Sequence, residues 1–365
     1  MAEIKVESIA KTFGAFAAVK GVKFTVDHGS FLVILGPSGC GKTTTLRMIA
    51  GLELPSTGRV LLDGEDVTAL PASARDIAFV FQLFALYPHM NVRQNMGFPL
   101  RCQNYPRAEI KRSVEETAKL LRINHLLESR VGGLSGGDRQ RVALGRAIVR
   151  RPKAFLMDEP LGALDSEFRR LMCGELRELH DRIDATTIYI THDQLEAMAM
   201  ADRIVIMNQG RVEQIGTPQE IYDRPNTMFV ADFIGAPPMS FLGVQTSLRR
   251  GDRSIRIDAA TVDMPELFED RAEGEFALGV RPENVSFADS SPLRGLVIGA
   301  EYLGTTQIVT VETGHGRVKA RLPSGTAVRV GERVGLALRS DRLSLFDAIS
   351  GQVLSSALHA GGVRG

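Results

Sequence analysis

The residues best suited to chemistry stand early in the chain, in the glycine-rich stretch Gly36-Pro-Ser-Gly-Cys-Gly-Lys-Thr43. It follows the apolar run Phe31–Leu35 and leads into residues typical of a helix start. Glycines at this spacing let backbone N–H groups turn around an anion, and a helix N-terminus adds partial positive charge. Lys42 can reach the outer phosphates of a nucleotide, and the Thr43 hydroxyl can bind Mg²⁺. The complete pattern in this context favours a nucleoside triphosphate site over a plain glycine-rich turn.

A pair of carboxylates forms the second set of candidates. Asp158 and Glu159 follow the short apolar run Ala154–Met157. A carboxylate at the tip of a strand can bind Mg²⁺, which suits Asp158. The adjacent Glu159 can act as the general base that polarises an attacking water. Such a pair is more often a solvated turn, but its place downstream of a phosphate-binding stretch favours the catalytic interpretation.

Two further polar side chains follow apolar runs. Gln82 comes after Ile77–Phe81, and His192 follows shortly after Thr187–Ile190. Strands alternate with helices here, which predicts a mainly parallel sheet. The polar residues would then lie together at the carboxyl ends of its strands. His192 can then hydrogen-bond a phosphate or an attacking water, although a lone histidine is more often a surface or core residue.

A second glycine-rich segment, Leu134-Ser-Gly-Gly-Asp138, opens the expected helix 138–150. Ser135 is a good N-cap residue, so the segment could simply be a capped helix. It could also be a second anion site, which a chain with one phosphate-binding stretch does not need for itself. Two copies facing head to tail, each completing the site of the other, would account for it.

The pattern of apolar residues divides the chain in two. Residues 1–235 alternate strands and helices, with a helical subdomain over about 88–153 that includes helical spacing at 107–129, and with a further helix at 166–182. Residues 236–365 show short apolar runs between turn residues, such as Ser254–Ile257 and Val328–Val330, which predicts a small β-barrel or sandwich.

Bulk properties exclude several classes of protein. The chain has 365 residues, 44 basic and 43 acidic, and a net charge of +1, which disfavours a polyanion partner held by bulk charge. Its three cysteines lack CxxC spacing, and with no signal-like start they favour a reducing compartment. No run approaches the ~18 apolar residues that would span a bilayer. Any membrane span must therefore come from other subunits.

Together, these segments resemble an ATP-binding cassette (ABC) ATPase. The matching positions, in order, are Phe13, Gly36–Thr43, Gln82, Leu134–Asp138, Leu156–Pro160, Asp165 and His192, which look like the aromatic stacking position, Walker A, Q-loop, signature, Walker B, D-loop and switch histidine. The segments Phe84–His89, Asn95-Met96, Thr191–Met198, Val230–Gly235 and Arg281–Asn284 resemble the ATPases of maltose and glycerol-phosphate importers. The resemblance covers essentially the full chain, most tightly residues 1–240.

The resemblance implies an α/β fold: a P-loop ABC-type nucleotide-binding domain with a helical subdomain, followed by an all-β OB-like regulatory domain of the TOBE/MOP type. It implies ATP and Mg²⁺ as ligands. The implied catalytic residues are Lys42, Gln82, Glu159 and His192, and the implied metal residues are Thr43, Gln82 and Asp158. The implied ATP-binding residues are Phe13, Gly36, Pro37, Ser38, Gly39, Cys40, Gly41, Lys42, Thr43 and Thr44, with Ser135, Gly136, Gly137, Asp138 and Asp165 acting across a dimer.

The resemblance also implies partners and a location. These are a second copy of the chain, two membrane permease subunits docking near Leu83–Asn95, and indirectly an extracytoplasmic solute-binding protein. A regulatory protein could bind the β-domain, and no nucleic acid is expected. The location implied is the cytoplasmic face of a bacterial-type inner membrane. The function implied is the ATP-hydrolysing motor of an importer for carbohydrates or related polar solutes; the alternative is an oxyanion or metal importer.

Two residues depart from the family pattern. Asp138 stands where the signature usually has Gln, which places a carboxylate near a partner's nucleotide: it could accept bonds from ribose or repel phosphate. Phe13 stands where tyrosine or tryptophan is common, and stacking survives this change. Because Glu159 and His192 are intact, we expect hydrolysis to survive both changes.

Overall fold

The structure is a computed structural model that describes residues 2–82, 84–162, 164, 166–183 and 185–360. It forms two compact units, residues 1–218 and residues 219–365. Among the described residues, no helix is both long and apolar enough to cross a membrane.

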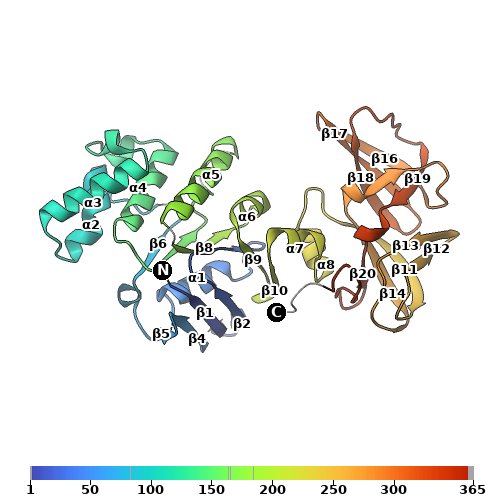
Figure 1. The fold of residues 1–365 in the computed structure, drawn as a ribbon, viewed down its shortest axis with the longest axis horizontal. Helices are drawn as coiled ribbons and strands as arrows, with labels where there is room; N and C mark the ends of the chain where they lie inside the picture. Colours follow the sequence, from blue (N-terminus) through green and yellow to red (C-terminus); the bar gives the residue numbers. More distant parts are fainter. Residues whose placement is uncertain (1, 83, 163, 165, 184, 361–365) are drawn as a thin grey trace. The chain divides into compact units, whose positions relative to one another are not determined.

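A six-stranded sheet forms the centre of the first unit (Figure 1). Its strands are β3 (Phe31–Leu35), β6 (Ile77–Val80), β7 (Ala154–Asp158), β8 (Thr186–Thr191), β9 (Arg203–Asn208) and β10 (Arg211–Gly216). The order is β10-β9-β3-β8-β7-β6, and only β10 runs antiparallel to its neighbour. Every residue of β3, β7 and β8 is buried, as expected for parallel strands covered on both faces. The parallel sheet expected from the sequence is confirmed.

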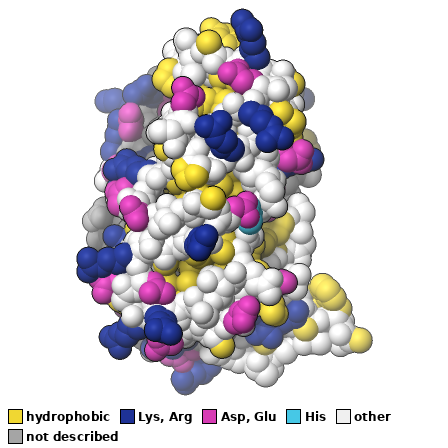
Figure 2. All heavy atoms as spheres, turned by 90° about the vertical axis from the view of Figure 1, so that its right-hand side faces the viewer, with side chains coloured by type: hydrophobic (Ala, Val, Ile, Leu, Met, Phe, Trp, Pro, Cys, Tyr) yellow, Lys and Arg dark blue, Asp and Glu magenta, His cyan; other side chains and the backbone are white. Residues whose placement is uncertain are grey.

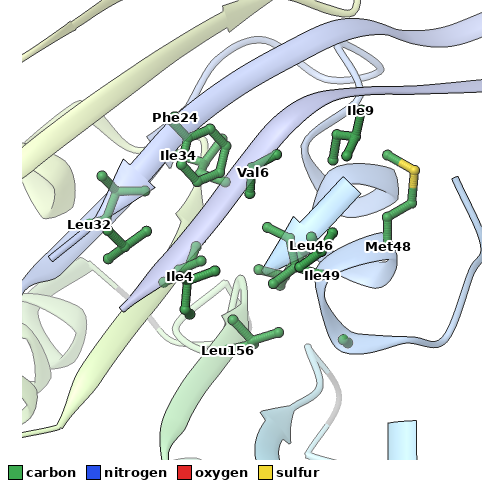
Figure 3. Packing of buried hydrophobic residues seen from close by; sticks show 14 of the residues in the cluster. Ile4, Val6, Ile9, Phe24, Leu32, Ile34, Leu46, Met48, Ile49 and Leu156 are labelled. Atoms are coloured by element: carbon green, nitrogen blue, oxygen red, sulfur yellow. The ribbon is translucent and has the colours of Figure 1, made fainter. Parts of the chain in front are cut away.

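A four-stranded antiparallel sheet packs beside it, in the order β2-β1-β4-β5. Its strands are β1 (Ile4–Phe13), β2 (Phe16–Val26), β4 (Thr57–Leu62) and β5 (Glu65–Asp66). Helix α1 (Lys42–Ala50) lies between the two sheets and buries its apolar face there (Figure 3). The shared core includes Ile4, Val6, Phe24, Leu32, Ile34, Leu46, Ile49 and Leu156. This core fixes the start of α1 relative to the end of β3.

Buried Arg75 fixes the other end of α1. Its guanidinium donates to the carbonyls of Met48 and Ile49 at 2.8 and 2.9 Å, and it also bonds the carbonyls of Thr68 and Leu70. The last carbonyls of a helix have no partner within the helix, so a buried donor set of this kind satisfies them. Burial lowers the pKa of Arg75.

Three helices group together in the helical subdomain of the first unit (Figure 1). They are α2 (Val92–Cys102), α3 (Arg107–Leu120) and α4 (Gly136–Ile148). The sequence predicted α3 and α4 but not α2, which contains Pro99 and begins with a capping box of Asn91 and Gln94. Two more helices, α5 (Ser166–Ile183) and α6 (Gln194–Met200), complete the unit.

The second unit is β-rich after two short helices, α7 (Pro218–Asp223) and α8 (Met228–Phe233). Its strands are β11 (Ser240–Leu248), β12 (Ser254–Ile257), β13 (Ala260–Asp263), β14 (Arg271–Val280), β15 (Val285–Phe287), β16 (Arg294–Tyr302), β17 (Thr306–Thr313), β18 (Gly316–Pro323), β19 (Arg333–Leu338) and β20 (Ser344–Asp347). They form sheets β11-β14-β20, β12-β13 and β15-β19-β16-β17-β18. Residues 328–330, expected as a strand, are irregular instead.

The second unit begins earlier than the expected border between residues 235 and 236 because α7 and α8 are bound to its β-structure. Arg281 is only 3% exposed, and its guanidinium binds both helices. It donates to the carbonyl of Tyr222 at 2.8 Å, to that of Ala231 at 3.0 Å, and to that of Ile234. It also lies 4.3 Å from the ring centre of Tyr222. One buried side chain therefore anchors both helices.

Candidate functional site

The glycine-rich loop connects β3 to α1. Gly41 caps the helix with φ at 102°, a left-handed conformation that favours glycine. A Cβ at this position would lie 2.6 Å from the carbonyl oxygen of Ala18, so no larger residue fits. The loop is thus a backbone cradle at a helix N-terminus, with Ser38 and Gly39 exposed and available to an anion.

Lys42 folds back into this cradle. Its Nζ donates to the carbonyl of Gly36 at 2.8 Å and to that of Pro37 at 3.0 Å, and the residue is only 6% exposed. The side chain therefore holds a positive charge inside the loop. Cys40 is also buried, and burial raises the pKa of its thiol, which suits a packing role rather than a reactive thiolate.

Thr43 and Asp158 bring two oxygen atoms together. Thr43 Oγ1 donates to Asp158 Oδ1 at 3.2 Å, across from α1 to the end of β7. Burial raises the pKa of Asp158, the bond from Thr43 opposes this shift, and Glu159 reinforces it. Hydroxyl and carboxylate oxygens are the ligands that Mg²⁺ prefers, so the donor set fits the ion expected from the sequence.

The carboxylate of Glu159 lies between two polar side chains. Gln82 Nε2 donates to its Oε2 at 3.2 Å, and His192 Nδ1 lies 3.3 Å from its Oε1. The strand order explains this meeting, because β7 lies between β6 and β8. The structure therefore brings together three residues that the sequence placed only on neighbouring strand tips.

Phe13 lies near the tip of the β1–β2 hairpin with 49% of its surface exposed. Lys11 Nζ lies 5.1 Å from the centre of its ring. The ring is thus accessible for stacking, as a base-binding residue requires. Thr44 is half-buried on the first turn of α1.

The signature segment begins α4, and Ser135 is its N-cap. Ser135 Oγ accepts from the backbone N–H of Asp138 at 3.2 Å and donates to Asp138 Oδ2 at 2.7 Å. Asp138 Oδ1 also lies 3.4 Å from Arg141, which pairs with Glu175 at 2.9 Å. The carboxylate of Asp138 therefore binds residues of its own helix. Within one chain, the segment forms a capped helix start.

The signature residues stay apart from the loop in one chain. Within the described residues, no hydrogen bond joins Ser135, Gly136, Gly137 or Asp138 to residues 36–44. Asp165, expected to support a partner site, lies outside the described residues, as does Leu83.

Three further residues organise the site's surroundings: Asn95, which the sequence singled out only through the family resemblance, and Arg146 and Arg169, which sequence reasoning missed. Asn95 is fully buried and binds the backbone of Tyr87, Met90 and Asn91. Arg146 binds the carbonyls of Phe84 and Ala85, and Arg169 binds Asp193 and the carbonyl of Leu164. The two carbonyls that Arg146 binds lie more than 60 residues away in the sequence, so no local pattern signals its role.

A groove of about 440 Å³ lies between α2, α4 and the segment after Gln82. Its lining includes Phe81, Ala85, Tyr87, Phe98, Cys102 and Arg146. Apolar and aromatic side chains beside arginines suit a docking site for a protein segment.

Comparison with known proteins identifies the family. Residues 19–162 match the model of the ABC transporter family, and residues 278–346 match that of the TOBE domain. The chain is 43% identical to the sulfoquinovosyl glycerol transport ATP-binding protein SmoE of Agrobacterium fabrum, over 95% of this chain and 98% of that protein. It is 42% identical to the trehalose/maltose import ATP-binding protein MalK of Thermococcus litoralis, over 97% of this chain and 100% of that protein.

A solved structure is similar as well. CbiO1 of Clostridium perfringens, part of the ABC transporter complex CbiONQ, aligns with a TM-score of 0.56 and 29% identity, over 60% of this chain and 89% of that one. The chain belongs to the family of ABC transporter ATP-binding proteins. It is an ATP-binding ATPase with a C-terminal TOBE domain, as the sequence indicated, and a subunit of a membrane transporter.

Proposed function

We propose that the cradle of residues 36–44 and the strand tips beside it form the catalytic half-site of an import motor. The observation that carries this proposal is Glu159 held between Gln82 and His192, one residue after the carboxylate bonded to Thr43. Lys42 and the loop amides bind the β- and γ-phosphates. Phe13 stacks on the adenine ring.

Thr43, Asp158 and Gln82 would hold Mg²⁺ through their oxygen atoms. Bound there, the ion would supply positive charge to offset charge that develops on the phosphate oxygens. Glu159 accepts a proton from the water that attacks the γ-phosphate, and Gln82 and His192 orient that carboxylate and the phosphate. The hydrogen bonds around Glu159 support these roles because they leave the carboxylate pre-oriented without a neutralising arginine or lysine partner among the described residues.

Two copies of the chain complete each site, in the proposed arrangement, by facing head to tail. Ser135 and Gly137 of one copy contact the γ-phosphate held by the other, with Asp165 supporting that contact. The exposed N-cap residue of α4, Ser135, supports this assignment, because a helix N-terminus attracts an anion. ATP closes the pair and hydrolysis reopens it.

Membrane permease subunits dock, in this proposal, near residues 83–95, on the groove that Tyr87 of this segment lines together with Phe98 of α2. The chain then lies at the cytoplasmic face of the membrane. The mixed apolar and aromatic lining of the groove supports this assignment.

The proposed cargo is a carbohydrate or related polar solute such as a glycerol phosphate. The relatives named for sulfoquinovosyl glycerol and for trehalose and maltose both support this class over the oxyanion or metal alternative. Basic and acidic side chains lie interspersed on the face shown in Figure 2, which supports a protein rather than a nucleic-acid partner. In this proposal, a regulatory protein can bind the β-structure of the second unit.

Co-purification tests the proposal. The tagged chain, isolated from its own cells, should bring down two membrane subunits, and the solute-binding protein of that transporter should be screened by thermal shift. Maltose, trehalose or sn-glycerol 3-phosphate should raise its melting temperature. A response to molybdate alone would instead support the oxyanion alternative. Recovery of ribosomes or nucleic acid in place of membrane subunits would overturn the proposal.

A further inference from the structure

The segment that follows Gln82 contains a strained turn. Phe84 and Ala85 both have positive φ, at 61° and 47°. Neither is glycine, and consecutive left-handed residues with a Cβ are unfavourable in an L-peptide. Within the turn, the backbone N–H of Phe84 donates to the carbonyl of Phe81 at 2.9 Å. Further contacts come from outside the turn.

Arg146 holds the turn from α4. Its NH1 donates to the carbonyl of Ala85 at 2.7 Å, and its NH2 donates to that of Phe84 at 2.7 Å. The planar guanidinium fork thus binds both left-handed residues at once, a geometry that a lysine cannot reproduce. The two bonds are short and charge-assisted.

The surroundings of Arg146 are unusual for a cation. Its guanidinium lies 5.3 Å from the ring centre of Tyr87, and burial lowers its pKa. Among the residues that the structure describes, no carboxylate lies within 4.0 Å of it. The partly buried guanidinium of Arg146 instead contacts two backbone carbonyls and the face of an aromatic ring. These contacts specialise the side chain for holding the turn.

The next residues of the segment are held by α2. Asn95 accepts from the backbone N–H of Tyr87 at 2.9 Å and donates to three carbonyls between residues 87 and 91. The rings of Tyr87 and Phe98 lie 4.6 Å apart. The segment that forms one wall of the groove is therefore clamped between α4 on one side and α2 on the other.

Helix α4 carries a candidate ATP contact, Ser135, at one end. Toward its other end it carries Arg146, whose two hydrogen bonds to the carbonyls of Phe84 and Ala85 we call the clamp. Ser135 caps its N-terminus, and Arg146 lies three turns further on, roughly 16 Å along the axis at 1.5 Å per residue. A continuous helix of this length moves as a rigid body. Any displacement of Ser135 on ATP binding is therefore passed to Arg146 and to the two carbonyls it holds.

We propose that Arg146 is a positioning residue that couples the signature end of α4 to the groove, by locking the left-handed turn at Phe84 and Ala85. This inference rests on the proposed function for what binds at each end. The two hydrogen bonds from Arg146 make the groove wall move with the signature helix. Breaking it should leave ATP binding intact and reduce the response of hydrolysis to the membrane subunits.

Three variants test the inference: R146A removes both bonds, R146K keeps the charge but not the fork, and R150A is the matched control. Arg150 lines the same groove but pairs with Asp76 at 3.9 Å and does not touch the turn. The first measurement is amide hydrogen exchange of the nucleotide-free full chain. Exchange over residues 84–88 should rise about tenfold or more in R146A, rise less in R146K, and stay unchanged in R150A.

The second measurement separates coupling from a purely structural role. In R146A, the KM for ATP and the basal turnover of the purified full chain should stay within about twofold, while stimulation of turnover by the co-purified membrane subunits falls about tenfold. R146K should lie between R146A and wild type. Equal losses of basal and stimulated turnover, or unchanged exchange at residues 84–88, would overturn the inference. A wild-type chain without any turnover would refute the proposed function, whereas the exchange result would still test the clamp.

Discussion

His192 Nδ1 lies 3.3 Å from Glu159 Oε1, at the ends of two adjacent parallel strands. The pairing of β7 with β8 sets this distance: Asp158 lies opposite Ile190, and the N–H of Glu159 donates to the carbonyl of Ile190 at 3.1 Å. Glu159 itself has a positive φ, 44°, which is uncommon for a residue with a Cβ. The two neighbouring carboxylates have different partners: Asp158 bonds Thr43, and Glu159 lies between Gln82 and His192.

Asp138 should weaken ATP-driven association of two copies. Its carboxylate engages the Ser135 hydroxyl at 2.7 Å, and that hydroxyl must be released before it can donate to a partner's phosphate. We expect D138Q to tighten ATP-dependent dimerisation about tenfold, since a bond to a charged group contributes about 1.5 kcal/mol or more. Analytical ultracentrifugation with ATP measures this. The control E175Q removes a partner of Arg141 and leaves the Ser135–Asp138 bond in place; D138Q associating no more tightly than E175Q would refute the explanation.

Arg75 should contribute strongly to stability of the first unit. R75A would strand four carbonyl groups, two of them at the C-terminus of α1. We expect a loss of about 3 kcal/mol in the free energy of unfolding. Urea unfolding followed by the helical circular dichroism signal measures it. R59A, an exposed arginine paired with Glu7, should cost less than about 1 kcal/mol, and equal effects of the two variants would contradict the role given to Arg75.

Arg281 should hold α7 and α8 against the β-structure of the second unit. In R281M, the carbonyls of Tyr222, Ala231 and Ile234 lose their donor. We expect limited proteolysis between residues 223 and 240 to accelerate about tenfold or more. R317A removes an exposed arginine of β18 and serves as the control. Equal cleavage rates in R281M and R317A would show that the helices are held by other contacts.

His359 should make the second unit less stable in acid. Burial, reinforced by nearby Arg224, lowers the pKa of His359 to about 4 from an ordinary value near 6.5. The unfolded chain then binds more protons than the folded one between these values, so stability falls as the pH drops from 6.5 towards 4 and levels off below. We expect a loss of about 2 kcal/mol across this window.

The H359Q variant checks this assignment. Urea unfolding of the second unit at pH 7 and pH 4.5 should show a smaller decrease for H359Q than for wild type. The same decrease in both would assign the acid sensitivity to other groups.

The parts of the fold that the sequence predicted depend on local patterns. The buried strands β3, β7 and β8 appear as short apolar runs bounded by turn or polar residues, and the glycine-rich loop or polar residues after each run indicate where the site lies. Because parallel strands end at one sheet edge, the proximity of Glu159 and His192 could be expected before any distance was known.

The parts that were missed depend on tertiary structure. Helix α2 contains Pro99, which argues locally against a helix, and packing in the helical subdomain overrides that signal. Residues 328–330 have strand-like composition but no strand neighbour. The sequence left open whether Asp138 faces the ribose or the phosphate of a partner's nucleotide. Within one chain, its side chain binds Ser135 and Arg141, each three residues away on the same helix start.

The substitution E159Q tests the central claim most directly. Glutamine keeps the size of the side chain and can still bond Gln82 and His192, but it cannot accept a proton from water. Turnover of the purified chain with its membrane subunits should fall at least about a hundredfold, while ATP-driven dimerisation persists or strengthens. Wild-type turnover in E159Q would contradict the assignment of Glu159 as the base.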